Sequence, residues 1–284
     1  MFFKSKEGKE KILKLYNQKL NQLNIDYSEK LLKTKFGNTN IIITGDTKQP
    51  PLVLVHGTGG CAPLILESFP NLSSKYCVYA IDVLAQPNKS AEQSLDIKSL
   101  DYGEWLLEVV IKLGLKDVTL VGFSFGGLIS LKALEYSEIL IKEVFLIAPV
   151  YIVNGNPLIN LWKMFIPLKK FIKTGNKQKI IKVMNVLFTE YDDFAQEFLT
   201  TTFLNCNMDF SPLPIIAKKS AQQIETPITI FACKNDIMFP GEKMIKRAKK
   251  VLPSLNNSVL LENSKHVPSR NNFSLIEKGI LKDF

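Results

Sequence analysis

The sequence predicts an α/β domain built on a mostly parallel sheet with helices on both of its faces. Six short runs are continuously apolar and rich in β-branched and aromatic residues, as strands are when helices cover both faces of their sheet. Helical patterns separate these runs, and such alternation indicates a parallel sheet. The 284 residues, of which 46% are hydrophobic, suffice for the core of one large domain with an insertion.

The predicted elements follow one another in a regular order. An amphipathic helix is expected over residues 7–23, because its apolar side chains recur at helical spacing. A hairpin should follow, with strands at 31–36 and 41–44 and turn residues between them. The six apolar strands are expected at 52–55, 76–81, 118–123, 143–148, 228–233 and 258–262, and the helices between them near 62–69, 99–113, 125–136, 240–252 and 268–282.

One long stretch interrupts this alternation between the fourth and fifth apolar runs. Its roughly eighty residues have helical character, and a plain connection of that length would be unusual in a compact domain. Helices are expected near 177–188 and 190–204, and an earlier helix should end or kink at Pro167, because proline removes a backbone donor. The stretch is therefore predicted to be a helical insertion.

The net charge of +9 comes almost entirely from lysine, since Arg247 and Arg270 are the only arginines. The lysines are spread along the whole chain, whereas a nucleic-acid-binding protein usually clusters its basic residues and uses arginine for phosphate. The charge, including that of the lysines within 163–173, is therefore interpreted as a solvated surface. No nucleic-acid partner is expected.

Histidine and cysteine usage gives no indication of a metal or a cofactor. The two histidines and four scattered cysteines show no spacing typical of a metal site, and unpaired cysteines fit a reducing compartment. No apolar stretch has the character of a signal peptide or the ~18 residues of a membrane-spanning helix. The expectation is a cytoplasmic monomer or homodimer without stable membrane insertion.

Residues 122–126 read Gly-Phe-Ser-Phe-Gly, a G-x-S-x-G motif between a predicted strand and a predicted helix. In that context the serine lies on a sharp, strained turn, and the flanking glycines let neighbouring backbone pass closely. The N-terminus of the following helix favours the negative charge that develops beside the serine. Ser124 is therefore the candidate nucleophile, and a glycine-rich turn that only packs a helix closely is the alternative.

A serine hydroxyl needs a base to become a good nucleophile, and the chain offers only His56 and His266. The chain order nucleophile, acid, base of this motif class places the histidine last, so His266 is the candidate base and His56 is interpreted as structural. Asp236 directly follows a predicted strand and should point to the same edge of the sheet as Ser124. Activity should rise with pH as the base loses its proton.

The glycine-rich residues 56–60, HGTGG, follow the first apolar strand and are expected to complete an oxyanion hole. A tetrahedral intermediate needs two backbone donors aimed at its oxyanion. One should be the N–H of Phe125, directly after the nucleophile. The other should be the N–H of Thr58 or, as the second choice, of Gly59. Gly57 and Gly59 would let backbone rather than side chain approach the substrate.

Together these segments resemble the α/β-hydrolase superfamily, and within it the compact esterase-like members with a helical cap. HGTGG, GFSFGG, KNDIMFP and SKHVP occur in the family's order. This sequence departs from the family pattern at Lys265, because many relatives carry glycine directly before the catalytic histidine. The departure affects the expected shape of that loop. The resemblance implies an eight-stranded, mostly parallel sheet with one antiparallel strand from the hairpin, an N-terminal helical extension at 1–26, a core at 27–149 and 223–284, and a helical cap at 150–222.

The resemblance implies a serine hydrolase that cleaves a carboxylic ester, with a small to medium apolar substrate, through an acyl-enzyme. Thioesterase, lactonase and carbon–carbon bond hydrolase remain alternatives on the same triad, as does a non-catalytic receptor or scaffold. A serine nucleophile argues against the related haloalkane dehalogenases and epoxide hydrolases, which use aspartate. Apolar side chains of the cap, Trp162 and Phe165 among them, are expected to line the substrate pocket together with Gly57 and Gly59.

The same glycines also match a competing motif. Gly57-x-Gly59-x-x-Ala62 follows a strand, as in the dinucleotide fingerprint, and Asp82 follows the next strand. However, that strand would be the third rather than the first, and this interpretation leaves the motif at Ser124 unexplained. The hydrolase hypothesis accounts for all of these segments and is preferred.

Overall fold

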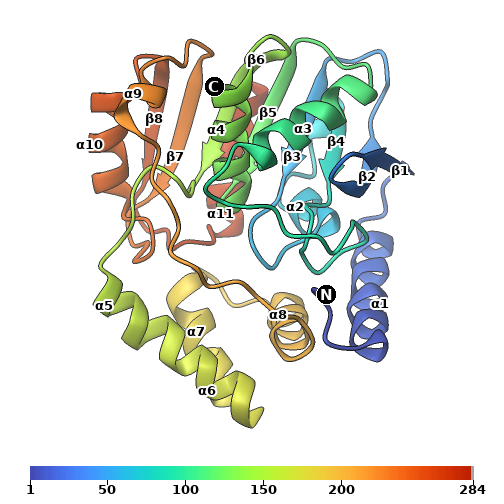
Figure 1. Ribbon diagram of the computed structural model, residues 1–284, viewed down its shortest axis with the longest axis vertical. Coiled ribbons are helices and arrows are strands. Elements are labelled where there is room, and N and C mark those ends of the chain that lie inside the picture. Colours follow the sequence, from blue (N-terminus) through green and yellow to red (C-terminus); the bar gives the residue numbers. More distant parts are fainter. Residues whose placement is uncertain (283–284) are drawn as a thin grey trace.

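The computed structural model describes residues 1–282 and contains one eight-stranded sheet. Its strands are β1 (Tyr27–Thr34), β2 (Gly37–Thr44), β3 (Pro51–Val55), β4 (Cys77–Ile81), β5 (Val118–Phe123), β6 (Ile141–Ile147), β7 (Ile228–Cys233) and β8 (Leu255–Leu261). Their spatial order is β1-β2-β4-β3-β5-β6-β7-β8 (Figure 1). Only the β1–β2 and β2–β4 pairs are antiparallel, so β2 alone runs against the other strands. The predicted eight-stranded, mostly parallel sheet is confirmed.

Helices cover both faces of the sheet, as predicted. The helices outside the insertion are α1 (Lys6–Gln22), α2 (Ala62–Glu67), α3 (Asp101–Lys112), α4 (Phe125–Tyr136), α10 (Gly241–Val251) and α11 (Arg270–Leu281). α3, α4 and α10 share one apolar core with the sheet, and α1, α2 and α11 share the other. The side chains of β3 alternate between these cores, with Val53 and Val55 in the first and Leu52 and Leu54 in the second, which explains why the strand is apolar throughout. Within residues 1–282, no helix has both the length and the apolar character that crossing a membrane requires.

The hairpin is longer than expected, and its turn lies elsewhere. β1 and β2 are joined by a two-residue turn at 35–36, not by residues 37–40. Gly37 then has a φ of +122°, a conformation that suits glycine. Asn40, an expected turn residue, lies in β2, where its Nδ2 atom donates to Asp82 Oδ2 over 2.9 Å in the interior. Asparagine is common in turns, so Asn40 wrongly indicated a turn in the sequence, although its side chain has a buried partner within the sheet.

The residues between β6 and β7 form a helical insertion, most of which lies below the sheet in Figure 1, whereas its last helix lies beside α10. It comprises α5 (Pro157–Asn160), the π-helical turn η2 (Leu161–Phe165), α6 (Ile166–Thr174), α7 (Lys177–Leu187), α8 (Asp193–Asn205) and the short α9 (Lys218–Ala221). α6, α7 and α8 pack around an apolar core of their own. The irregularity expected at Pro167 is present as the π-helical turn η2, which ends directly before α6. Pro167 itself lies in the first turn of α6, where its missing N–H is not needed. The limits proposed for the cap, 150–222, and for the core segments remain predictions, and the last two residues of segment 223–284 lie outside the described part.

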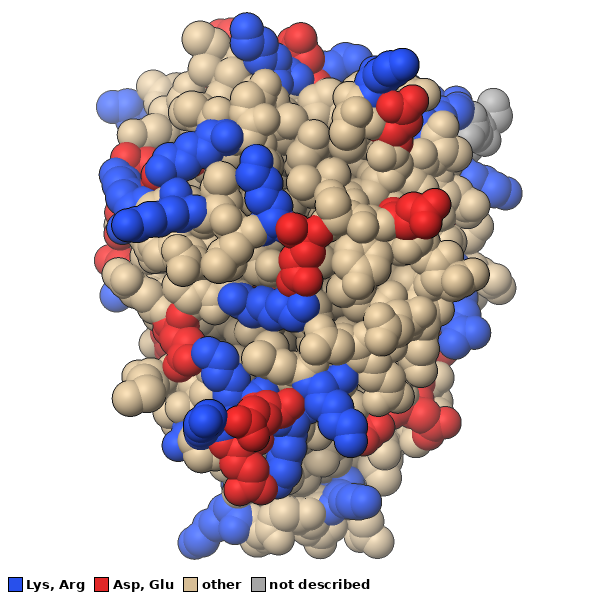
Figure 2. All heavy atoms as spheres, turned by 90° about the vertical axis from the view of Figure 1, so that its right-hand side faces the viewer, with Lys and Arg blue, Asp and Glu red and all other residues tan. Residues whose placement is uncertain are grey.

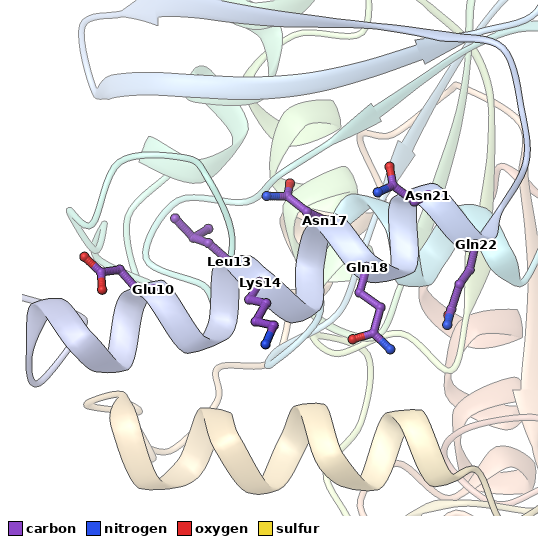
Figure 3. A pocket seen from close by; sticks show the side chains of 7 residues that line it. All are labelled: Glu10, Leu13, Lys14, Asn17, Gln18, Asn21 and Gln22. Atoms are coloured by element: carbon purple, nitrogen blue, oxygen red, sulfur yellow. The ribbon is translucent and has the colours of Figure 1, made fainter.

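The first residues of the chain bind the end of α8. Residues 2–4 and 205–207 lie side by side through an isolated antiparallel bridge, and the Lys4 N–H donates to Asn205 O over 2.8 Å. α1 then lies along α8 (Figure 3). The N-terminal helix therefore contacts both the sheet and the insertion.

The face of the molecule that carries α1 and β1 has charges of both signs lying among one another (Figure 2). Several of them pair, such as Lys11 with Glu7 and Lys89 with Glu29, each with an N–O distance of 2.7 Å. This face agrees with the interpretation of its lysines as a solvated surface.

We expect Gly103→Ala to destabilise the fold, because α3 and α4 touch backbone to backbone at Gly103. A Cβ atom there would lie 2.2 Å from Lys132 O. Relieving such overpacking typically costs about 1–3 kcal/mol, which outweighs the gain of up to ~1 kcal/mol from alanine's higher helix propensity. Denaturant unfolding measures the change, and Ile111→Ala on the exposed side of α3 is the matched control, expected to stay within about 0.5 kcal/mol of the wild type. Equal stability of both variants would contradict the close packing.

Candidate active site

Ser124 lies on the sharp turn that joins β5 to α4. Its φ of +51° and ψ of −109° are unusual for a residue with a side chain. The two glycines of the motif are sterically required, because a Cβ atom at Gly122 would lie 2.5 Å from Gly126 O and one at Gly126 would lie 2.2 Å from Val55 O. The turn thus presents the serine hydroxyl at the N-terminus of α4.

The structure brings Ser124, His266 and Asp236 into one hydrogen-bonded chain. His266 Nε2 lies 2.9 Å from Ser124 Oγ, and His266 Nδ1 lies 2.7 Å from Asp236 Oδ2. An ionised carboxylate can only accept, so Nδ1 carries the proton and Nε2 is free to accept from the serine hydroxyl. All three residues are at most 8% exposed, so bulk water competes little for these bonds.

Neighbouring groups fix the orientation of the acid and the imidazole. Asp236 Oδ1 accepts from the backbone N–H groups of Met238 at 2.7 Å and Phe239 at 3.1 Å. The rings of Phe239 and Phe123 lie on the imidazole of His266, with centroid distances of 5.4 and 5.6 Å. Such support holds a reactive constellation in one geometry.

The loop that carries His266 also pairs with the segment between α7 and α8. The Val267 N–H donates to Leu187 O over 2.8 Å, and the Thr189 N–H donates to Val267 O over 3.0 Å. On the other side of the histidine, the Lys265 N–H donates to Thr189 Oγ1 over 2.9 Å. The Lys265 ammonium donates to a carbonyl oxygen near the end of α7, so a residue that departs from the family pattern takes part in this junction.

The glycine-rich loop after β3 lies against the nucleophile. A Cβ atom on Gly57 would be 3.1 Å from Ser124 Cβ, so only a glycine fits there without displacing its neighbours. Gly59 has a φ of +71°, and its N–H donates to Gln86 Oε1 over 2.8 Å. Thr58 between them is exposed. The N–H of Gly59 is therefore already engaged.

A cavity of about 350 Å³ lies beside this loop. Its lining includes both expected oxyanion donors, Thr58 and Phe125, together with Phe2, Gln86, Tyr102 and Met208. Sequence reasoning missed the last four, because they come from four separate segments and belong to no motif. Only the three-dimensional fold brings them together.

Trp162 and Phe165 are not part of this lining, nor are Gly57 and Gly59. The triad side chains are not part of it either, and the cavity meets the site through Thr58 and Phe125. Trp162 is 68% exposed, and Phe165 packs in the insertion, where its ring contacts Phe210 at a centroid distance of 5.9 Å. Leu158 and Leu161, which precede Trp162, are also exposed. The prediction that Trp162 and Phe165 line a pocket is therefore not supported by their positions.

A second hollow follows the surface of α1 (Figure 3). All seven of its lining residues belong to that one helix: Glu10, Leu13, Lys14, Asn17, Gln18, Asn21 and Gln22. None of them belongs to the triad or the glycine-rich loop. We assign it no role in the chemistry.

His56 and Asp82 serve the structure. His56 is 2% exposed; its Nε2 accepts from the Val83 N–H over 3.0 Å and its Nδ1 lies 2.8 Å from Gly57 O. Asp82 is fully buried and accepts from the Ala62 N–H at the start of α2; burial raises its pKa to about 6. Because Asp82 is occupied in this way and β3 is the third strand, the geometry argues against a dinucleotide site.

We expect His56 to make the fold less stable in acid. Burial lowers the pKa of His56 to about 4, although its bond to Gly57 opposes this shift. The unfolded chain therefore binds a proton more readily, and the stabilisation present above pH ~6.5 is lost as the pH falls toward 4, by at most about 3 kcal/mol. Denaturant unfolding at several pH values should show this slope in the wild type and a smaller one in His56→Gln. The raised pKa of Asp82 changes stability with pH in the opposite direction, but Asp82 is present in both the wild type and His56→Gln, so it does not affect the comparison. The same dependence of stability on pH in both proteins would refute the lowered pKa of His56.

Comparison with known proteins agrees with this architecture. Residues 50–183 match the family described as alpha/beta hydrolase fold. The chain is 23% identical over 285 residues to an uncharacterized carboxylesterase, nap, of Bacillus subtilis (strain 168), covering 95% of this chain and 90% of the relative. It is 31% identical over 127 residues to the carboxylesterase YbfK of the same organism, covering 45% of this chain and 43% of that one.

The likeness extends to solved structures. The crystal structure of naproxen esterase (carboxylesterase NP) from Bacillus subtilis superposes with a TM-score of 0.85 at 20% identity, covering 99% of both chains. The eight-stranded, mostly parallel sheet is the one that the resemblance implied, and the turn at Ser124 is strained as the G-x-S-x-G motif predicts. This chain has the α/β-hydrolase fold, and its residues 50–183 match the family of that description.

Proposed function

We propose that this protein is a serine esterase that cleaves a small to medium, apolar carboxylic ester. The observation that carries the proposal is the hydrogen-bonded chain from Ser124 through His266 to Asp236. Phe125, directly after the nucleophile, lines a neighbouring cavity. Relatives over most of the chain and over part of it are named carboxylesterases, which supports an ester rather than another acyl compound.

The geometry supports the following reaction. Ser124 Oγ attacks the carbonyl carbon while its proton passes to His266 Nε2, and Asp236 stabilises the resulting imidazolium. His266 then returns the proton to the departing alkoxide, which leaves as the alcohol. A water molecule, deprotonated by the same nitrogen, attacks the acyl-enzyme. The bond to Ser124 Oγ then breaks, His266 returns the proton to that oxygen, and the acid is released.

The oxyanion would be held by the N–H groups of Phe125 and Thr58. Phe125 is the first residue of α4, whose N-terminus favours negative charge. Thr58 is preferred to Gly59 as the second donor, because the N–H of Gly59 already donates to Gln86. In this arrangement Gln86 keeps the glycine-rich loop in the conformation that directs Thr58 toward the cavity.

Reaction with a fluorophosphonate probe tests this function directly. An activated serine forms a covalent adduct, so purified wild-type protein should be labelled at Ser124 and should hydrolyse p-nitrophenyl esters. A thioester and a lactone measured alongside establish whether esters are preferred. A protein that is neither labelled nor active on any of these substrates would be a scaffold, and the proposal would be wrong.

We expect the size of the cavity to set the preference for acyl length. Each methylene that enters it gains ~0.8 kcal/mol, or about fourfold in kcat/KM, until the space is filled. Met208→Ala should enlarge the space and move the optimum of a p-nitrophenyl ester series to longer chains, because Met208 lines the cavity. Trp162→Ala is the matched control, since its exposed side chain lies outside the lining. The same ranking of esters in wild type and Met208→Ala would show that substrate binds elsewhere.

A further inference from the structure

Thr189 contacts both neighbours of His266 through a single hydroxyl. Thr189 Oγ1 accepts from the Lys265 N–H over 2.9 Å and donates to Val267 O over 2.7 Å. Its backbone N–H adds a bond of 3.0 Å to the same Val267 carbonyl. The backbone on either side of the imidazole is therefore held by one residue of the insertion.

We propose that Thr189 is a positioning residue for His266, an inference that rests on the proposed function. His266 must keep Nε2 within 2.9 Å of Ser124 Oγ while Nδ1 stays 2.7 Å from Asp236. Its ring is held by packing, but its backbone lies in a loop after β8 whose strand pairing has ended. The hydrogen bonds of Thr189 hold this part of the loop in place of strand pairing. Their loss would let His266 shift, and a displacement of about 1 Å at a catalytic group can cost up to 10²-fold in rate.

The test compares Thr189→Val, which keeps the shape and loses the hydroxyl, with Thr189→Ser, which keeps the hydroxyl. We expect the valine variant to lower kcat for a p-nitrophenyl ester roughly 10- to 100-fold with little change in KM, and to be labelled more slowly by a fluorophosphonate. The serine variant should recover most of the rate. Thr44→Val is the matched control, because Thr44 Oγ1 also bonds a backbone carbonyl, that of Asp26, far along the chain from the triad.

Two results would overturn the role of Thr189. One is a wild-type kcat in Thr189→Val, and the other is a rate that falls only in proportion to the folded fraction and is not recovered by serine. Failure of the proposed function looks different, because the wild type itself would then resist the probe and leave the esters intact.

A separate observation concerns the lysines of the insertion. Residues 157–189 contain seven lysines and no aspartate or glutamate, and acidic side chains return only at Glu190. No salt bridge between described residues includes any of these seven, whereas lysines of α1 pair with glutamates. The seven are Lys163, Lys169, Lys170, Lys173, Lys177, Lys179 and Lys182.

Large apolar side chains stand in solvent on the same segment. Leu158 is 65% exposed and Trp162 is 68% exposed, and Ile159 and Leu161 beside them exceed 40%. α5 and α6 form the lower border of the molecule, away from the sheet (Figure 1). Lys163 directly follows Trp162, and Lys169 and Lys170 follow in α6; all three are exposed, so apolar and basic side chains stand in solvent on the same outer segment.

We infer that this edge docks on the surface of a membrane that contains anionic phospholipids. Exposed leucine and isoleucine gain free energy only in an apolar phase, which a nucleic acid does not offer, and tryptophan favours the interfacial region of a bilayer. Unpaired lysines complement anionic headgroups, each contributing about fivefold in affinity. Such docking is peripheral and requires no membrane-spanning helix.

The two tryptophans make the inference directly measurable. Trp105 is fully buried, so a change in emission on binding reports Trp162. With vesicles of phosphatidylglycerol and phosphatidylcholine we expect cosedimentation and a shift of emission to shorter wavelength. Lys169→Gln/Lys173→Gln should weaken binding roughly 25-fold, while Lys246→Gln/Lys249→Gln on α10, which removes the same charge, should change it little.

The inference is overturned if the protein does not sediment with the anionic vesicles, or sediments without any change in Trp162 emission. Equal binding to pure phosphatidylcholine would contradict the role of the lysines. Heparin or an acidic protein that produces the same emission shift would assign the edge to a different partner.

Discussion

Ser124→Ala is expected to lower kcat for ester hydrolysis by a factor on the order of 10⁴–10⁶ and to abolish fluorophosphonate labelling. The loss is large because the whole covalent route depends on one oxygen atom, which lies 2.9 Å from the base. The fold should remain intact, since alanine removes only an atom that the backbone of the turn does not use. Steady-state kinetics and thermal unfolding of the purified variant measure both quantities.

Ser130→Ala is the matched control for this prediction. Ser130 lies on the same helix, is fully buried, and donates to Gly126 O over 2.7 Å, but it does not contact His266. Its replacement should cost about 1 kcal/mol of stability and leave turnover within a few-fold of the wild type. If Ser124→Ala retained near-normal activity, the nucleophile would have to be another residue.

His266→Gln is expected to cost nearly as much as Ser124→Ala, because members of a triad act as a unit. Glutamine has no nitrogen that could accept the serine proton, so both acylation and deacylation lose their base. His56→Gln should keep measurable turnover, since the ring of His56 bonds Val83 and Gly57 rather than Ser124. Kinetics of the two variants at one pH separate the two histidines.

The rate of labelling by a fluorophosphonate gives a second measurement of the same effect. Ser124 is still present in His266→Gln, so labelling should become slow rather than disappear. The opposite pattern, with full activity in His266→Gln and none in His56→Gln, would exclude the chain order on which the assignment of the base depends.

Much of the fold could be predicted because its signals are local. A parallel strand covered on both faces must be apolar throughout, as in β3 and β5, and the carboxyl ends of such strands meet at one edge. For that reason Ser124 and Asp236, each directly after a predicted strand, could be expected near each other. Gly122 and Gly126 predict the sharp turn in the same local way, because each lies against neighbouring backbone that leaves no room for a side chain.

The lining of the cavity could not be predicted, because it depends on where separate segments meet. Gln86 follows β4 in a loop without any motif, and Met208 follows α8. The apolar character of Trp162 and Phe165 suggests burial, but a sequence does not tell which apolar side chains of a helix the rest of the protein covers. The hairpin turn was misplaced for a related reason, because the buried partner of Asn40 lies 42 residues further along the chain.

The pairing of residues 2–4 with 205–207 has a consequence for the order in which this chain folds. Lys4 and its partners at the end of α8 are 199 and 200 residues apart, so most of the polypeptide must leave the ribosome before the first residues find their place. α1 can meet the sheet earlier through Ile12 and Tyr16, but the backbone bridge of residues 2–4 cannot form until α8 has formed. Protection of residues 1–5 from proteolysis should therefore be among the last events of refolding, and its appearance would mark the docking of the insertion.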